Sequence, residues 1–361
     1  MSVLDLARQE LRAIRPYVPG QYEPGCIRLN ANESPWRSPG DTTERGLNVY
    51  PPPRPSMLTA KLGGYYGVEQ RQILVTRGSS EAIDVLIRGF CAAGRDSILI
   101  APPTFDMYRL YATIQNAGIK RVPLRSDFTL DVDRMLAAVD ANTKIVFVCT
   151  PNNPTGQSMA RADVERLCAE LAGRALVVID EAYHEFASAP HFLELRNRYE
   201  HVVLLRTLSK FVSLAGVRCG ALIAAPEVVE FCQGVLPPYT FPTPSIELVM
   251  QALSQDSLRV SAERVATIKR ERARLSAALR DVPQVLEVYP SDANFVMVRT
   301  RDGAAFRETA RRANILVRTF EDPLLAECVR ITIGRPADND LLLRALAGAT
   351  ERRGAERPID A

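Results

Sequence analysis

Short hydrophobic segments alternate with amphipathic stretches from about residue 58 to residue 224. We interpret the hydrophobic segments as buried strands and the amphipathic stretches as helices. The expected strands are residues 73–75, 97–101, 144–149, 175–179, 202–205 and 220–224. The expected helices begin near residues 79, 104 and 161. Because continuous hydrophobic strands separated by helices are typical of a mainly parallel sheet with both faces covered, the pattern predicts an α/β domain.

Two regions depart from this alternation. Residues 1–50 contain one short helix and are then rich in Pro, Gly and Asn, so we expect an arm that lies on its own subunit or on a second one. From residue 244 a long Arg-rich helical stretch runs to residue 279, broken near residue 255, and shorter elements follow it. The expected elements are strands at 286–289, 294–299, 315–317 and 328–333, and helices at 303–314 and 337–349. We therefore divide the chain into an N-terminal arm (1–50), a large domain (51–243) and a small α+β domain (244–361).

Composition excludes several classes of protein. The net charge is only +3 at pH 7 and arginine is scattered along the chain, which disfavours a nucleic-acid surface. No hydrophobic run is long enough to span a membrane, and the N-terminus has no signal-peptide core. The 7 cysteines form no C-x-x-C pair, so we expect reduced thiols in a cytoplasmic protein. The 3 histidines show no metal-ligand spacing, so we expect chemistry that depends on Lys, Tyr, Asp and Arg.

The polar stretch 206–220 reads R-T-L-S-K-F-V-S-L-A-G-V-R-C-G and follows a predicted buried strand. It places Lys210 between the hydroxyls of Thr207 and Ser209 and the guanidinium of Arg218. Cations and hydroxyls can hold a phosphate, and a neighbouring positive charge lowers the pKa of a lysine so that its neutral amine can attack a carbonyl. The alternative for so short a motif is an exposed lysine at the end of a strand.

Three further polar clusters follow predicted strands: R-G-S-S-E at 77–81, T-P-N-N-P-T-G at 150–156 and D-E-A-Y at 180–183. The first opens a helix, so its free N–H groups and the hydroxyls of Ser79 and Ser80 could bind an anion. Taken singly, the second could be a plain turn, and the Asp that begins the third could be a helix cap. In a parallel sheet all four clusters would meet at the carboxyl edge, where ligands bind.

Together the clusters contain what a phosphate-bearing aldehyde cofactor requires. These groups are an amine, a carboxylate for a pyridinium nitrogen, donors to a phenolic oxygen, an aromatic ring to stack on and phosphate ligands. The residues that supply them are, in that order, Lys210; Asp180; Asn153 and Tyr183; Phe105; and Ser79, Ser80, Thr207, Ser209 and Arg218. No G-x-x-x-x-G-K-[ST] loop occurs and no G-x-G-x-x-G follows a strand, so a nucleotide fits less well. The sequence therefore predicts a site for pyridoxal 5'-phosphate.

The motifs P-N-N-P-T-G, D-E-A-Y-x-E-F and T-L-S-K-x-x-x-L-A-G-x-R resemble those of the class I/II aminotransferases of the aspartate aminotransferase fold. Within that family, L-N-A-N-E-S-P, Y-P-x-P, P-P-T-F-x-M-Y and V-R-I-T-I-G are similar to the histidinol-phosphate aminotransferase branch, and the resemblance spans about residues 10–345. It implies fold type I, with a mainly parallel sheet of the seven-stranded type, and a homodimer. It also implies ping-pong transamination through a Schiff base on Lys210, with Asp180 keeping the pyridine nitrogen protonated. Tyr50 would contact the cofactor phosphate of the partner subunit.

The resemblance also implies the substrates: histidinol phosphate and 2-oxoglutarate would give imidazole acetol phosphate and glutamate, in histidine biosynthesis. Arg330 matches the arginine that holds the substrate carboxylate, Arg318 and Tyr17 match residues that contact a substrate phosphate, and Asn153 would also face the substrate. A dianionic phosphate gains from a second guanidinium and a hydroxyl. Three alternatives remain open: an aromatic or general amino-acid aminotransferase, a threonine-phosphate decarboxylase, and a non-catalytic binding protein of the same fold.

Residues 211–213 depart from the family pattern. They read F-V-S where the family usually has A-F-G, so Ser213 stands in place of a glycine. The spacing from Lys210 to Arg218 is retained. We therefore expect the departure to reshape the pocket floor and alter specificity more than catalysis.

Overall fold

The protein contains a large mixed sheet at the centre of its larger domain. The structure, a computed structural model, describes residues 2–18, 27–189 and 191–355, and within them this sheet has seven strands in the order β1-β7-β6-β5-β4-β2-β3. The strands are β1 (Ile73–Thr76), β2 (Ser97–Ile100), β3 (Gly118–Arg121), β4 (Thr143–Cys149), β5 (Leu176–Asp180), β6 (Val202–Thr207) and β7 (Gly220–Ile223). Neighbours from β6 to β3 are parallel, whereas β7 is antiparallel to both β6 and β1. The predicted α/β fold with a mainly parallel sheet is confirmed.

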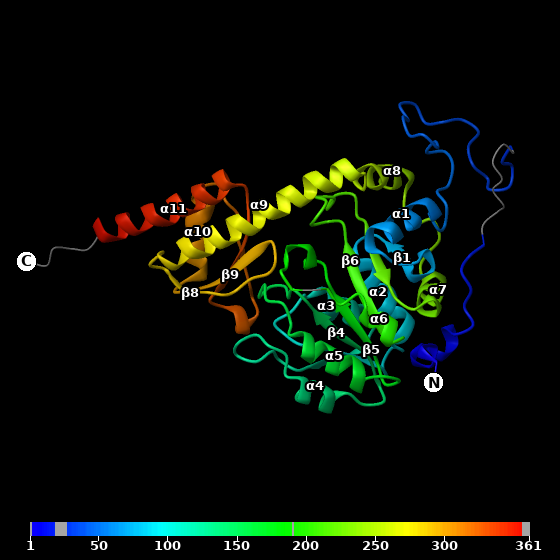
Figure 1. Cartoon of the computed structure of the whole chain (residues 1–361), viewed down its shortest axis with the longest axis horizontal. Helices are drawn as coiled ribbons and strands as arrows, with labels where there is room; N and C mark the ends of the chain where they lie inside the picture. Colours follow the sequence, from blue (N-terminus) through cyan, green and yellow to red (C-terminus); the bar gives the residue numbers. More distant parts are fainter. Residues whose placement is uncertain (1, 19–26, 190, 356–361) are drawn as a thin grey trace, which may run out of the picture.

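Helices cover both faces of this sheet (Figure 1). Alternate side chains of one strand enter different cores: Val146 and Val148 of β4 pack in the core with α1, α4, α5 and α8, whereas Ile145 and Phe147 pack in the core with α2, α3 and α7. This period of two is the geometry of a strand that is buried on both faces. The elements of this part are η1 (Val3–Leu6), η2 (Gln9–Leu11), α1 (Ser56–Tyr66), η3 (Gln70–Gln72), α2 (Ser79–Phe90), α3 (Met107–Ile114), α4 (Val132–Ala138), α5 (Arg161–Glu170), η4 (His184–Phe186), α6 (Leu195–Arg198), α7 (Pro226–Val235) and α8 (Thr243–Ala252).

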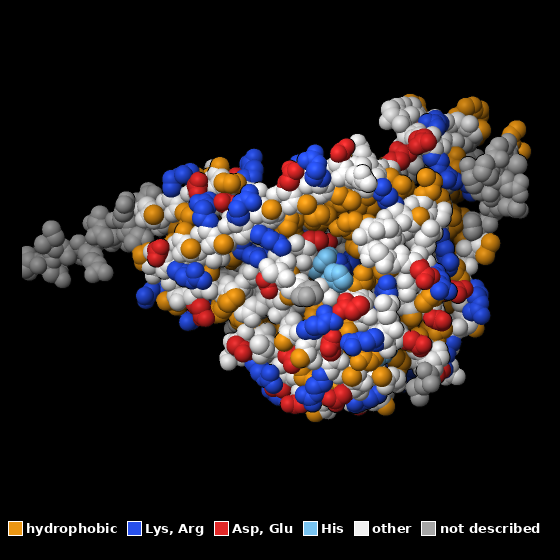
Figure 2. All heavy atoms as spheres, viewed as in Figure 1, with side chains coloured by type: hydrophobic (Ala, Val, Ile, Leu, Met, Phe, Trp, Pro, Cys, Tyr) orange, Lys and Arg blue, Asp and Glu red, His pale blue; other side chains and the backbone are white. Residues whose placement is uncertain are grey.

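A long helix, α9 (Gln255–Arg280), leads from α8 into a second, smaller sheet (Figure 1). That sheet is antiparallel, in the order β10-β11-β9-β8. Its elements are β8 (Val285–Val288), β9 (Phe295–Thr300), α10 (Gly303–Arg312), β10 (Arg318–Thr319), η5 (Pro323–Leu325), β11 (Cys328–Thr332) and α11 (Pro336–Ala355). The predicted break near residue 255 is confirmed, because the Ser254 side chain caps α9 by accepting a hydrogen bond from Ser257 N. Figure 2 shows hydrophobic side chains gathered where α8 and the start of α9 meet the large domain.

Several predicted elements were wrong in detail. The strand expected at 315–317 is instead β10, Arg318–Thr319. Ile315 and Val317 pack against the core of the small domain, but residues 313–315 form the turn that ends α10, with Asn314 in the left-handed region (φ 60°) and Ile315 N bonded to Ala310 O. The first helix is two 3₁₀ turns, and the helix expected from residue 104 begins at Met107. The edge strand β3 was missed because it is half exposed and not continuously hydrophobic.

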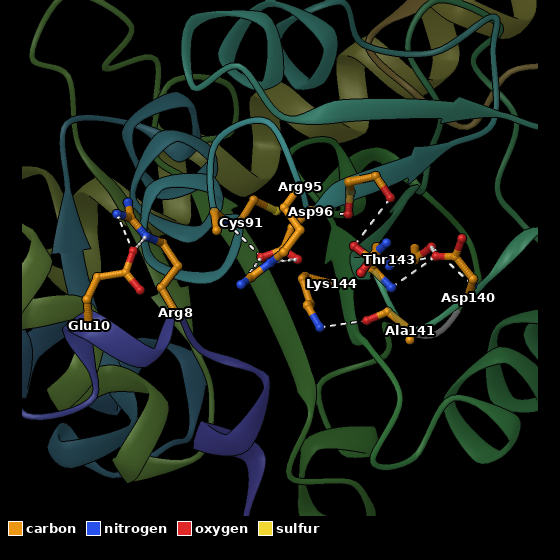
Figure 3. A network of polar contacts seen from close by, with 12 residues as sticks. Arg8, Glu10, Cys91, Arg95, Asp96, Asp140, Ala141, Thr143 and Lys144 are labelled. Atoms are coloured by element: carbon orange, nitrogen blue, oxygen red, sulfur yellow. Dashed lines mark hydrogen bonds and ion pairs between the residues drawn. The ribbon is translucent and has the colours of Figure 1, made fainter.

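A polar network anchors the amino ends of β2 and β4, at the edge of the sheet away from the predicted clusters (Figure 3). Asp96 accepts a hydrogen bond from Ala92 N at 2.8 Å and pairs with Arg95. Arg8 forms an ion pair with Glu10 and donates from Nη1 to Arg88 O, which ties the N-terminal 3₁₀ turns to the end of α2. We assign a structural role to this network.

The described part of the N-terminal arm packs on its own chain through η1 and through an aromatic cluster around Tyr239. The Tyr50 ring stacks on Tyr239 with centroids 4.7 Å apart, and the Tyr17 ring meets the same side chain edge-on at 6.0 Å. Beyond this cluster the arm extends away from the large domain (Figure 1). Four of its described hydrophobic side chains are at least 78% exposed: Val18, Ile27, Leu29 and Trp36. Such exposure of large hydrophobic side chains is typical of a surface that binds another chain.

The six cysteines among the described residues are free and buried, and Cys26 lies outside the described residues. No group of three or more His, Cys, Asp or Glu side chains in the described ranges is arranged to bind a metal. None of the helices that the structure describes combines the length and the hydrophobicity needed to cross a membrane.

Candidate active site

One pocket brings the four sequence clusters together. It opens at the carboxyl ends of β4, β5 and β6 and at the first turn of α2. Its lining residues are Gly78, Ser79, Ser80, Phe105, Cys149, Asn153, Asp180, Ala182, Tyr183, Thr207, Ser209, Lys210, Ala215 and Arg218. This set includes every residue that the sequence suggested for the cofactor except Tyr50. The carboxyl edge of a parallel sheet positions them, because all of its strands end there.

A cup suited to an anion occupies one end of the pocket. Ser79 and Ser80 form the first turn of α2, where backbone N–H groups are free and the helix dipole favours negative charge. Arg218, held in the left-handed region (φ 61°), donates from Nη2 to Arg77 O. Gly78 must be glycine, since its φ is +79° and a Cβ would lie 2.8 Å from Arg218 Nη2. The close approach of the Gly78 backbone to the Arg218 guanidinium therefore determines the shape of this cup.

Two hydroxyls from the end of β6 face the same cup. Thr207 Oγ1 donates to Ser209 Oγ at 2.9 Å and accepts from Ser209 N at 3.2 Å. Gly220 lets β7 pass close to the start of α2, because a Cβ on it would lie 2.6 Å from the carbonyl carbon of Gly78. This contact brings the β6 hydroxyls and the N-terminus of α2 to one ligand position.

Lys210 is the residue after Ser209, and its side chain lines the pocket. Its Nζ lies 5.6 Å from the centroid of the Tyr183 ring. Burial is the main cause that lowers the pKa of Lys210, and the positive charges of Arg330 and Arg218 lower it further. A lysine with a lowered pKa carries more neutral amine near pH 7, which is the form that attacks a carbonyl.

Asp180, the last residue of β5, has a fully buried carboxylate. Its Oδ2 accepts a hydrogen bond of 2.8 Å from Tyr108 Oη, and its Oδ1 accepts one of 3.1 Å from Ala182 N. Burial raises the pKa of Asp180 to about 6, against the lowering effect of these two donors. A buried carboxylate without an ion-pair partner in the described chain is suited to a cationic group of a ligand.

The small domain reaches the pocket through Arg330 of β11. Arg330 Nη1 donates to Asn153 Oδ1, and Asn153 Nδ2 donates to Tyr183 Oη at 3.2 Å. The guanidinium also lies over the Phe295 ring, 5.2 Å from its centroid. Arg318, which is exposed, is the cross-strand partner of Arg330 in the β10–β11 ladder. The pKa of Arg330 is lowered by burial and then by the positive charge of Arg318.

The remaining predicted residues have different positions. Phe105 lines the pocket, whereas Tyr17 and Tyr50 lie on Tyr239 and do not line the pocket of their own chain. Phe211 stacks on Tyr65, with ring centroids 6.2 Å apart, and packs against the hydrophobic cluster that contains Tyr183.

None of residues 211–213 lines the pocket directly, so their expected effect on the pocket floor stays a prediction. The substituted residue does occupy a glycine-like conformation, since Ser213 has φ 59°.

Four residues in this region were not found from the sequence. Cys149 lines the pocket beside Asp180, and Arg206 and Glu181 form a buried ion pair of 2.7 Å between β6 and the residue after Asp180. Tyr108 had a signal, since it is the last residue of P-P-T-F-x-M-Y, but its partner is 72 residues away in the chain. Pairings at such separations depend on the tertiary structure and leave no local pattern.

The fold and the lysine pocket define an aminotransferase of class I and II: residues 23–346 match that family, and the chain belongs to it. Among its curated relatives is the histidinol-phosphate aminotransferase of Xanthomonas campestris pv. campestris (strain 8004), 43% identical over 96% of this chain and 97% of that protein. The histidinol-phosphate aminotransferase of Sinorhizobium meliloti, solved in complex with pyridoxal-5'-phosphate, superimposes with a TM-score of 0.76 at 23% identity, covering 85% of this chain and 84% of that one.

An L-threonine-O-3-phosphate decarboxylase from Porphyromonas gingivalis has the same fold, with a TM-score of 0.72 at 23% identity over 84% of this chain and 91% of that one. The fold alone therefore does not separate transamination from decarboxylation.

Proposed function

We propose that this protein is a pyridoxal-phosphate-dependent aminotransferase that converts histidinol phosphate and 2-oxoglutarate into imidazole acetol phosphate and glutamate, a step of histidine biosynthesis. The observation that carries the proposal is the pair of cross-strand arginines, Arg318 and Arg330, of which Arg330 donates a hydrogen bond to Asn153 in the lining of the pocket that contains Lys210. Two guanidinium groups suit a dianionic phosphate better than a single carboxylate. The sequence similarity to histidinol-phosphate aminotransferases supports the same substrate.

The pocket fits pyridoxal phosphate by the chemistry of its donors. Ser79, Ser80, Thr207, Ser209 and Arg218 would hold the phosphate at the N-terminus of α2. The remaining contacts would come from Asp180 to the ring nitrogen, Asn153 and Tyr183 to the ring oxygen, Phe105 to the ring face and Lys210 to the aldehyde carbon. When bound, pyridoxal phosphate supplies an electrophilic carbon for amine exchange and a ring that takes up the electrons of the substrate's Cα–H bond.

The side chains of this protein would then perform binding and proton transfer. Arg330 and Arg318 would bind the anionic group of the substrate and orient its amine toward Lys210. The neutral amine of Lys210 would take the proton from the substrate Cα as a general base and deliver it, as a general acid, to the carbon that the cofactor presents as its aldehyde. Asp180 would remain ionised to keep a positive charge on the ring nitrogen, and Tyr183 and Asn153 would donate to the ring oxygen.

The assembly that we propose is a cytoplasmic homodimer. Tyr50 and Tyr17 would both line the pocket of the partner subunit, since neither lines the pocket of its own chain. The exposed hydrophobic side chains of the arm would be covered by the second copy. In this assembly residues 1–50 act as the arm, 51–243 as the cofactor domain and 244–361 as the small domain.

An assay of the purified protein tests the proposed substrate. Histidinol phosphate, phenylalanine and threonine phosphate are each supplied with and without 2-oxoglutarate, and glutamate and CO₂ are measured. We expect glutamate from histidinol phosphate only when 2-oxoglutarate is present. Release of CO₂ from threonine phosphate without an oxo acid would instead identify a decarboxylase, and preference for phenylalanine would identify an aromatic aminotransferase.

Arg318→Ala is expected to raise KM for histidinol phosphate by about tenfold to a hundredfold, the effect of one charge-assisted contact to phosphate, with little change in kcat. Steady-state kinetics with histidinol phosphate and with phenylalanine measure the difference. Arg299→Ala is the matched control, because Arg299 lies on β9 of the same sheet and pairs with Glu287 at the surface. Equal losses for both substrates would argue against a phosphate contact by Arg318.

A further inference from the structure

Tyr108 lies behind the pocket and is held rigidly without lining it. Its side chain is fully buried in the core between α3 and the sheet. The ring stacks on Phe147 of β4, with centroids 4.5 Å and planes 13° apart, and meets the Phe105 ring edge-on at 5.7 Å. These two aromatic contacts hold the Tyr108 ring in one position, which directs its hydroxyl at Asp180.

The hydrogen bonds of Asp180 assign one donor to each carboxylate oxygen. Tyr108 Oη donates to Oδ2 and Ala182 N donates to Oδ1. Within the described residues Asp180 has no ion pair, so these two donors are the compensation for burying its charge. Since each donor engages a different oxygen, the plane of the carboxylate has one orientation.

We propose that Tyr108 is a positioning residue, whose hydroxyl keeps Asp180 ionised and in one orientation as the partner of a pyridine ring nitrogen. The inference rests on the proposed function, because it takes Asp180 as the ligand of that ring. A hydrogen bond to the charged form of a carboxyl group favours that form, and bonds to charged groups are the stronger ones. Phenylalanine at this position would keep the ring contacts and lose only the donor.

Among the titratable side chains around Asp180, Tyr108 is the residue to substitute in a test of the proposal. The titratable side chains that face Asp180 are Tyr108 from α3, Cys149 from β4, and Glu181 and Tyr183 from its own segment. Burial raises the pKa of Tyr108, Cys149 and Tyr183, so all three stay protonated near pH 7 and Tyr108 remains a donor. Burial also raises the pKa of Asp180 to about 6, and loss of the Tyr108 donor would raise it further.

The test is the affinity of apoprotein for pyridoxal phosphate, measured by fluorescence quenching from pH 5.5 to 8.5. Wild-type affinity should weaken as pH falls through the pKa of Asp180. In Tyr108→Phe the midpoint should lie at higher pH, with binding about tenfold weaker at pH 7. Tyr199→Phe, which removes a hydroxyl beside His201 just before β6, should match the wild type. In an Asp180→Asn background, Tyr108→Phe should cause no further pH shift.

The outcomes separate the inference from the proposed function. A Tyr108→Phe midpoint equal to that of the wild type would overturn the role of Tyr108 while leaving the cofactor assignment intact. Failure of the wild type to bind pyridoxal phosphate at any pH would overturn the proposed function instead. In that case the effect of the Tyr108 hydroxyl on the ionisation of Asp180 can still be measured with the apoproteins. The pH at which Asp180 ionises, read from the pH dependence of unfolding by urea, should be higher in Tyr108→Phe and unchanged in Tyr199→Phe.

Discussion

Lys210→Ala is expected to abolish transamination, with kcat reduced by about 10⁴-fold or more. Lys210 is the one lysine among the described residues that line the pocket, so no second amine can replace it as nucleophile and general base. Its pKa is lowered by burial and by the positive charges of Arg330 and Arg218. Single-turnover measurements with histidinol phosphate would quantify the loss.

Covalent trapping provides a readout that does not depend on turnover. Borohydride treatment in the presence of pyridoxal phosphate should attach the cofactor to Lys210 in the wild type, and mass spectrometry of the peptides should show it there. Lys144→Ala is the control, because Lys144 lies at the opposite edge of the sheet and donates to Ala141 O (Figure 3). Transamination by Lys210→Ala at the wild-type rate, or attachment at another lysine, would refute the assignment.

Asp180→Asn is expected to reduce turnover by about a hundredfold to a thousandfold, because a neutral amide cannot balance the charge of a protonated ring nitrogen. Breaking a buried charge pair by removing one partner typically costs about 3–5 kcal/mol. Steady-state kinetics and cofactor affinity at pH 7.5 measure the loss. Asp106→Asn is a suitable control, since Asp106 is exposed and pairs with Arg109 at the start of α3. Losses of similar size in both variants would contradict a special role for Asp180.

The same substitution should change how the stability of the apoprotein depends on pH. The pKa of Asp180 is raised from 3.8 to about 6 in the folded protein, so the folded state binds more protons than the unfolded state between these values. The free energy of unfolding should therefore fall, by about 3 kcal/mol, as pH rises from 4 through 6. Asp180→Asn should lose this decline, which urea denaturation at pH 4.5 and 7.5 would reveal. An unchanged pH dependence would mean that Asp180 ionises as freely in the folded chain as in the unfolded one.

Local sequence patterns specified six of the seven strands that the structure describes in the large sheet, and the chemistry at their ends. Buried strands such as β4 and β5 are continuous hydrophobic runs, which depend on local residue type alone. The polar residues that follow them are adjacent in the chain, so a rule about the carboxyl edge sufficed to bring Asn153, Asp180 and Lys210 together. Local patterns failed where the residues suited more than one structure, as at 315–317, where Ile315 closes the turn that ends α10 and the strand starts only at Arg318.

Which distant side chains meet depends on the tertiary structure. Arg330 reaches Asn153 across 177 residues and Tyr108 reaches Asp180 across 72, and each contact requires two elements to pack in one register. The placement of β7 between β1 and β6 likewise requires the close approach that Gly220 permits at the start of α2. Hydrophobic patterns specify that a strand or helix is buried but not against which partner, because burial of hydrophobic surface is non-directional. The hydrogen bonds that tune Asp180, and the burial and positive charges that tune Lys210, therefore arise from packing.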